Sequence, residues 1–150
     1  MRGFPAESAI PDRGIAQRWR DATPWLQGIL RIVAAFLFMQ PGTMKLFGFP
    51  MPMPPGMELH LFSQIGLAGI LEVFGGALML VGLFTRPVAF VLSGEMAVAY
   101  FQAHARHGFW TLTNGGTDAV FYCFLWLFFS AAGAGNLSLD ARRAARHTTT

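Results

Sequence analysis

Residues 64–87 read QIGLAGILEVFGGALMLVGLFTRP, and this stretch decides the fold. It is apolar over the roughly 20 residues that a helix needs to cross the hydrocarbon core of a bilayer, yet it contains one carboxylate, Glu72. A charge at that depth is costly, so such a residue usually faces the interior of a helical bundle. Gly69, Glu72 and Gly76 share one face of the helix, where small residues let another helix approach closely. The stretch therefore predicts a packed transmembrane helix with a buried acid.

The composition of the whole chain is typical of a membrane protein. Its 150 residues are 53% hydrophobic and only 13% charged, with a mean hydropathy of +0.43, which is too apolar for an ordinary soluble domain. The single cysteine excludes an internal disulfide framework and a Cys-x-x-Cys redox centre. The net charge of +3 comes largely from arginines near the two ends, which fits membrane topology and anionic lipid better than nucleic acid. We therefore expect the lipid bilayer, and no nucleic acid, as a partner.

Three other apolar segments predict further transmembrane helices. Together they give an all-α membrane protein with a four-transmembrane-helix bundle over residues 25–134, its spans being 25–47, 65–84, 88–104 and 117–134. Residues 1–24 and 135–150 are expected to be tails. An even number of spans places both termini on one side of the membrane. The positive-inside rule, applied to the arginines of the tails and to Arg86, makes that side the cytoplasm.

Buried charges at matching depths predict two clusters inside the bundle. At roughly 1.5 Å of rise per residue, Arg31 and Glu95 lie at similar depths from the cytoplasmic side, which predicts an inner ion pair. Lys45, Glu72 and Asp118 lie in the outer half and predict an outer cluster. Pairing lowers the cost of burying charge. Two interpretations stay open: the pairs fix helix register, or they mark a site or a proton pathway.

The outer cluster is the candidate catalytic site, with Glu72, Lys45 and Asp118 as its members. Gln40 and Thr43, beside the bend predicted at Pro41, are candidate binding residues because they can hydrogen-bond to a quinone head group or a small oxyanion. The inner residues Arg31 and Glu95 complete the candidate binding set. Histidines near the end of the third span fit an interfacial position better than a metal site, so no metal is predicted.

Several motifs spread along the chain resemble the DoxX family. They are Arg31 followed by Gly42-x-x-Lys45-Leu46, then Leu71-Glu72 with Gly75-Gly76, Leu83-x-x-Arg86, and Gly133-x-Gly135-x-x-Ser138-Leu139-Asp140. The resemblance covers nearly everything after Trp25. The family usually has a glutamate near Asp118 and a bulky residue near Asn136, and this chain departs from it there. The resemblance implies a four-helix protein of the bacterial or archaeal inner membrane, related to thiosulfate:quinone oxidoreductases and to membrane-bound redox or oxidative-stress complexes.

Three classes of function remain open from the sequence. The first is a component of a quinone-linked oxidoreductase or redox-stress system, in which buried acids handle protons. Quinone is then the expected cofactor, and electrons come from substrate or a redox partner protein, since no flavin, haem or iron–sulfur motif is present. The second is a non-catalytic membrane anchor or assembly factor for a partner complex, or a homo-oligomer, which glycine-lined helix faces suit. The third is a small-solute carrier, and Pro41 is the only feature of the sequence that favours it.

Overall fold

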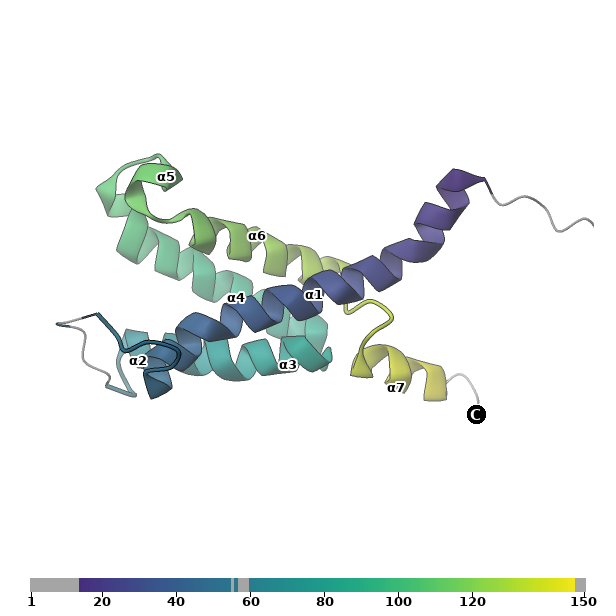
Figure 1. The fold of residues 1–150 in the computed structure, drawn as a ribbon, viewed down its shortest axis with the longest axis horizontal. Helices are drawn as coiled ribbons and strands as arrows, with labels where there is room; N and C mark the ends of the chain where they lie inside the picture. The colour runs from purple at the N-terminus through teal and green to yellow at the C-terminus, as the bar shows by residue number, and fades with distance from the viewer. Residues whose placement is uncertain (1–13, 55, 57–59, 148–150) are drawn as a thin grey trace, which may run out of the picture.

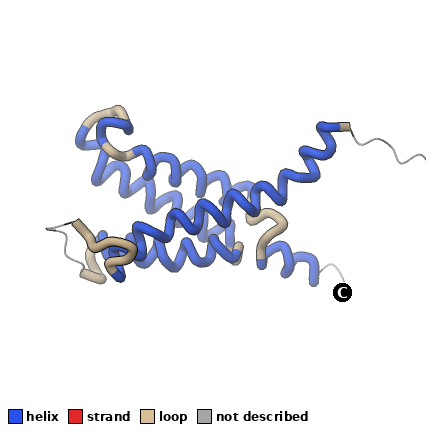
Figure 2. The backbone as a smooth tube through the Cα atoms, in the orientation of Figure 1, coloured by secondary structure: helices blue, strands red, loops and turns tan. Residues whose placement is uncertain are grey.

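The computed structural model describes residues 14–54, 56 and 60–147, and all regular structure within these residues is helical (Figures 1 and 2). The first half contains α1 (Ile15–Phe47) and one helical segment formed by α2 (Gln64–Ile70), a π-helical turn η1 (Leu71–Gly75) and α3 (Gly76–Val81). The second half contains α4 (Thr85–Ala99), which continues into a π-helical turn η2 (Tyr100–His104) and a 3-10 turn η3 (Ala105–His107). The short α5 (Thr111–Asn114), α6 (Thr117–Ala132) and α7 (Leu139–His147) follow.

The helix bounds differ from those of the segments that the sequence predicts: α1 and α4 begin earlier, whereas α3 and α6 end at Val81 and Ala132, before residues 84 and 134. Helix α1 begins at Ile15, inside the tail expected over 1–24, and continues through both Pro24 and Pro41. The rest of that tail, residues 1–13, lies outside the described residues. Helix α7 lies inside the tail expected over 135–150. Apolar periodicity sets where a helix must be buried, whereas a helix can continue into polar sequence wherever its backbone stays solvated.

The surfaces of the bundle are apolar. Two helical segments in the described residues, Ile15–Phe47 and Gln64–Val81, are long and apolar enough to cross a membrane, and α6 is apolar but shorter. Large apolar side chains on four helices are exposed, among them Val33, Phe36, Phe74, Phe90, Val91, Phe121, Phe124 and Phe128. Soluble proteins rarely expose apolar surface on this scale, whereas lipid tails can cover it.

The core lies between two pairs of helices. Helix α1 lies along α2, η1 and α3, and α4 lies along α6 (Figure 1). Phe38 of α1 joins the pairs, because its ring meets the edge of the Trp126 ring with centroids 5.2 Å apart. Met79, Leu92 and Phe129 are buried around this contact. The packing fixes which faces of α1, η1 and α4 meet, and the charged residues lie on these faces.

Helix α1 approaches η1 most closely at Gly42. A Cβ atom at Gly42 would lie 2.7 Å from the Cβ of Glu72 and 3.0 Å from the backbone nitrogen of Val73. These distances are too short for any side chain, so the absence of one permits the contact. The same contact brings the next turn of α1, which carries Lys45, beside Glu72.

We expect Gly42→Ala to lower the free energy of unfolding by roughly 1–3 kcal/mol, because the added methyl group forces α1 away from η1. Thermal unfolding of the purified protein in detergent measures this. Gly94→Ala is the matched control, since a Cβ at Gly94 of α4 meets nothing within 4 Å and alanine favours a helix over glycine. Equal melting temperatures for the two variants would contradict a close contact at Gly42.

Candidate functional site

Lys45 and Glu72 form a buried ion pair between α1 and η1. The Lys45 Nζ atom lies 2.6 Å from each of the two carboxylate oxygens of Glu72. The Glu72 side chain is only 4% exposed, and that of Lys45 is 22% exposed. Hydrogen bonds to both oxygens satisfy a carboxylate that would otherwise be costly to bury. The structure thus brings together two of the three residues predicted for the outer cluster.

Glu72 occupies a π-helical turn, which the sequence analysis missed. The turn runs from Leu71 to Gly75 and is flanked by regular α-helix on both sides. Such turns are rare, and they occur frequently at functional sites because the widened backbone redirects side chains. Composition does not predict it, although Gly75 and Gly76, three and four residues after Glu72, are the feature that could have indicated it.

Glu95 of α4 is the third ionisable member of this site. Both of its carboxylate oxygens are buried and lack a hydrogen-bond partner, and it interacts electrostatically with Glu72 and Lys45. A buried polar group without a partner destabilises a protein by roughly 1–3 kcal/mol. Such groups are few in folded proteins, and each calls for a functional explanation. We name Lys45, Glu72 and Glu95 the acid cluster.

A cavity of about 320 Å³ adjoins the acid cluster between α2, η1 and α4. Its lining is largely apolar, with Glu95 and Gln64 as the polar exceptions; the apolar residues are Leu67, Ala68, Leu71, Val91, Gly94, Val98 and Ala99. The Gln64 amide already donates a hydrogen bond to the side-chain oxygen of Gln102. We name this space the Glu95 cavity. It can hold a small apolar molecule beside a carboxyl group.

The other residues predicted for the outer site lie apart from the acid cluster. Asp118 is exposed in the first turn of α6, and its charge acts on Tyr122. The described residues show no hydrogen bond or ion pair between Asp118 and the Lys45–Glu72 pair. The Gln40 side chain is exposed, and the Thr43 hydroxyl donates to the Gln40 carbonyl oxygen at 2.9 Å. Similar depth in the bundle therefore does not bring these three side chains to the cluster.

The predicted pair of Arg31 and Glu95 does not form, and Arg31 has backbone partners instead. The Arg31 side chain is fully buried, and its Nε atom donates to the Ala134 carbonyl oxygen at 3.0 Å. Its Nη1 atom donates to Leu80 at 2.9 Å and also to Met79, and Nη2 donates to Leu137. The last carbonyls of α3 lie at the negative end of the helix dipole, and the Met79 oxygen also accepts a hydrogen bond from the Gly82 amide at 3.2 Å. They attract the guanidinium in place of a carboxylate.

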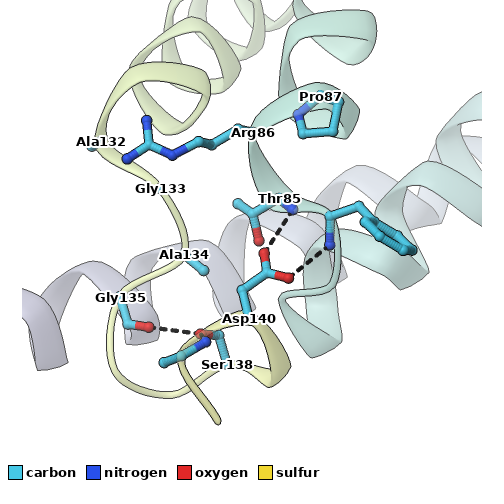
Figure 3. A pocket seen from close by; sticks show the side chains of 11 residues that line it. Thr85, Arg86, Pro87, Ala132, Gly133, Ala134, Gly135, Ser138 and Asp140 are labelled. Carbon is cyan, nitrogen blue, oxygen red and sulfur yellow. Dashed lines mark hydrogen bonds between the residues drawn. The ribbon is translucent and has the colours of Figure 1, made fainter. Parts of the chain in front are cut away.

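A second polar network, which we name the α7 clasp, lies at the same end of the bundle as Arg31. Asp140 of α7 accepts hydrogen bonds from the backbone amides of Phe84 at 3.0 Å and Thr85 at 2.8 Å, at the start of α4 (Figure 3). The Ser138 hydroxyl donates to the Gly135 carbonyl oxygen at 2.8 Å (Figure 3). Arg86 donates to the Ser130 carbonyl oxygen at 3.2 Å, near the end of α6. The clasp ties α4, α6 and α7 together.

The clasp explains motifs that the sequence analysis singled out. Burial alone would raise the pKa of Asp140, but hydrogen bonds from Thr85 and Phe84 and the charge of Arg143 together lower it below its usual value. Asp140 therefore stabilises the fold above its unfolded pKa, and this contribution is lost as the pH falls through the lowered value.

A cavity of about 360 Å³ beside Asp140 is lined by residues of both motifs of this region, 83–86 and 133–140. The backbone already satisfies Asp140 and Arg86, so we assign the clasp to stability.

Metal binding has no visible basis in the part of the chain that the structure describes. No three histidine, cysteine, aspartate or glutamate side chains gather there in a way that could hold a metal ion. Cys123 of α6 is a free cysteine, and its neighbour Ser93 donates to the Cys123 carbonyl oxygen at 2.8 Å. The ionisable groups of the acid cluster are two carboxyl groups and one amine.

Helices with apolar outer faces and a buried ion pair define an all-helical membrane protein. The family model described as DoxX matches residues 26–105. The chain belongs to the DoxX family. An uncharacterised protein from Haemophilus influenzae is 42% identical over 120 residues, which cover 78% of this chain and 90% of that protein. An uncharacterised membrane protein from Mycobacterium tuberculosis is 28% identical over 138 residues, covering 79% and 82% respectively. No solved structure matches the chain.

Proposed function

We propose that the chain spans the bacterial inner membrane four times, with both termini in the cytoplasm. Helices α4 and α6 lie alongside the two longer apolar segments and complete a bundle of four. The backbone amide of Asn136 donates to the Pro24 carbonyl oxygen at 3.0 Å, so the first part of α1 and the segment that leads into α7 lie at the same end of the bundle (Figure 1). The described arginines of the two tails lie on the helices at this end, in keeping with the positive-inside rule; they are Arg18, Arg20, Arg142, Arg143 and Arg146.

A reporter enzyme that is active only in the periplasm tests this topology. Fused after Thr150, it is expected to stay inactive, while the same reporter placed in the loop at Gly56, at the other end of the bundle, is expected to be active. Activity from the fusion after Thr150 would contradict the proposed orientation.

We further propose that the protein is a quinone-linked component of an oxidoreductase or redox-stress system, which acts through the acid cluster. The observation that carries this proposal is a buried ion pair with a second, unpartnered acid beside an apolar cavity. Reduction of a quinone to a quinol takes up two electrons and two protons. A redox partner protein supplies the electrons in this scheme, and the buried carboxyl groups pass the protons.

We expect Glu72→Gln to fold and insert. Its rate of quinone reduction in membranes is expected to fall at least tenfold, because the amide keeps the shape of the side chain and removes the group that carries the proton. Quinone that co-purifies with the protein, identified by its optical spectrum, gives a second measurement. Asp21→Asn, which changes an exposed acid on α1, is the matched control and is expected to stay within twofold of the wild type.

Two results would count against the proposal. Full function of Glu72→Gln in cells that depend on the protein would make Glu72 structural. Wild-type protein that neither reduces nor retains quinone would favour the alternative function, a non-catalytic anchor or assembly factor for a partner complex.

A further inference from the structure

Glu95 differs from Glu72 in having no partner of its own. Both oxygens of Glu72 are bonded to Lys45, so this pair is satisfied and neutral overall. The two Glu95 oxygens have no hydrogen-bond partner, although the Glu95 side chain forms part of the wall of the Glu95 cavity. The polar group at this wall that still lacks a partner is therefore the Glu95 carboxyl group.

The rim of the Glu95 cavity carries exposed apolar side chains. Leu67 of α2 is 56% exposed, and Val91 and Val98 of α4 are 52% and 49% exposed. All three line the cavity, so a molecule dissolved in the bilayer can reach it without crossing the bundle. The volume of about 320 Å³ lies within the range of small-molecule sites. Apolar walls favour an uncharged molecule, because a charge placed there would be desolvated.

We propose that an uncharged, lipid-soluble carbonyl compound enters the Glu95 cavity from the bilayer, and that the acid form of Glu95 donates a hydrogen bond to its carbonyl oxygen. This inference rests on the proposed quinone-linked function and names the binding residue and the route for its substrate class. Glu95 then contacts the ligand directly, whereas Glu72 is hydrogen-bonded to Lys45 and does not line the cavity.

Gly94 permits a sharp test, because it lines the same cavity and a Cβ atom there meets nothing within 4 Å. Gly94→Leu is designed to place an apolar side chain in the cavity, starting from a Cβ position that is open. Ala97→Leu is the matched control, since Ala97 is close by on α4 but lines a different cavity of about 470 Å³. That second cavity is lined by aromatic rings and has no carboxyl group; its rings are Tyr100, Phe101, Phe109, Trp110 and Phe124.

The probe is ubiquinone-1, titrated into the purified full-length protein in detergent and followed by calorimetry. We expect Gly94→Leu to weaken binding at least tenfold and Ala97→Leu to stay within twofold of the wild type. Glu95→Leu is expected to weaken binding at least tenfold, and Glu95→Gln, which keeps a hydrogen-bond donor, to stay within about threefold. Glu95→Met replaces Glu95→Leu if the latter does not elute as a folded species from size-exclusion chromatography.

The possible results distinguish failure of the Glu95 binding site from failure of the proposed quinone-linked function. If the wild type binds no ubiquinone-1, the quinone-linked function itself fails. If the wild type binds and Ala97→Leu abolishes binding while Gly94→Leu keeps it, the ligand occupies the aromatic cavity and the inference is overturned. Unchanged binding by Glu95→Leu also overturns it.

Discussion

Replacing Lys45 with methionine is expected to lower the free energy of unfolding by roughly 3–5 kcal/mol, because it leaves the Glu72 carboxylate buried without its cation. Lys45 Nζ is bonded to both oxygens of Glu72 at 2.6 Å, and Glu72 is 4% exposed. Methionine keeps the length and apolar stem of the lysine, so the lost charge is the main change. The yield of folded protein in detergent and its unfolding midpoint measure the effect.

The double variant Lys45→Met with Glu72→Gln serves as the control for this experiment. It removes both charges together, and we expect it to recover most of the lost stability, because a buried pair is often replaceable by neutral groups of similar size. If the single variant is as stable as the wild type, the pair contributes little and the carboxylate has another partner. If the double variant is no better than the single one, Lys45 acts through its packing.

Replacing Arg31 with methionine is expected to lower the free energy of unfolding by at least about 3 kcal/mol, because several buried carbonyl groups lose their donor at once. Arg31 is fully buried and donates to backbone oxygens of Met79, Leu80, Ala134 and Leu137. Arg31→Lys is expected to recover only part of this loss, since an ammonium group cannot match the flat, forked donors of a guanidinium. Thermal unfolding in detergent measures both variants.

Two further variants sharpen the interpretation of Arg31. Arg18→Met changes an exposed arginine of the same helix and is expected to stay within about 0.5 kcal/mol of the wild type. The charge swap Arg31→Glu with Glu95→Arg is expected to recover nothing, because Arg31 binds carbonyl groups and does not contact Glu95. If the swap recovers the folded protein, that result would support the Arg31–Glu95 ion pair that the sequence predicts.

The difference between the predicted and observed partners of Arg31 has a simple physical origin. Every residue has a carbonyl group, so a sequence does not mark the few carbonyls that a buried guanidinium contacts. Here they lie where α3 ends at Gly82, whose φ of 68° suits glycine, and where the chain leaves α6. The approach of residues 134–137 to α1 then completes a cage that only the folded chain contains.

The membrane class and the family follow from the sequence, and so does the approximate position of the apolar helical segments, because apolar length and helical spacing are local properties. The sequence also placed Lys45 and Glu72 at matching depths, since depth follows from the rise per residue. The tertiary structure alone decided which faces meet. The π-helical turn at Glu72 forms only in the folded chain. There, Glu95 and not Asp118 is the neighbour of the ion pair, and Arg31 donates to backbone carbonyl groups. Rotation of each helix about its axis depends on how all the helices pack together, as at Gly42 and Phe38, and no single segment encodes it.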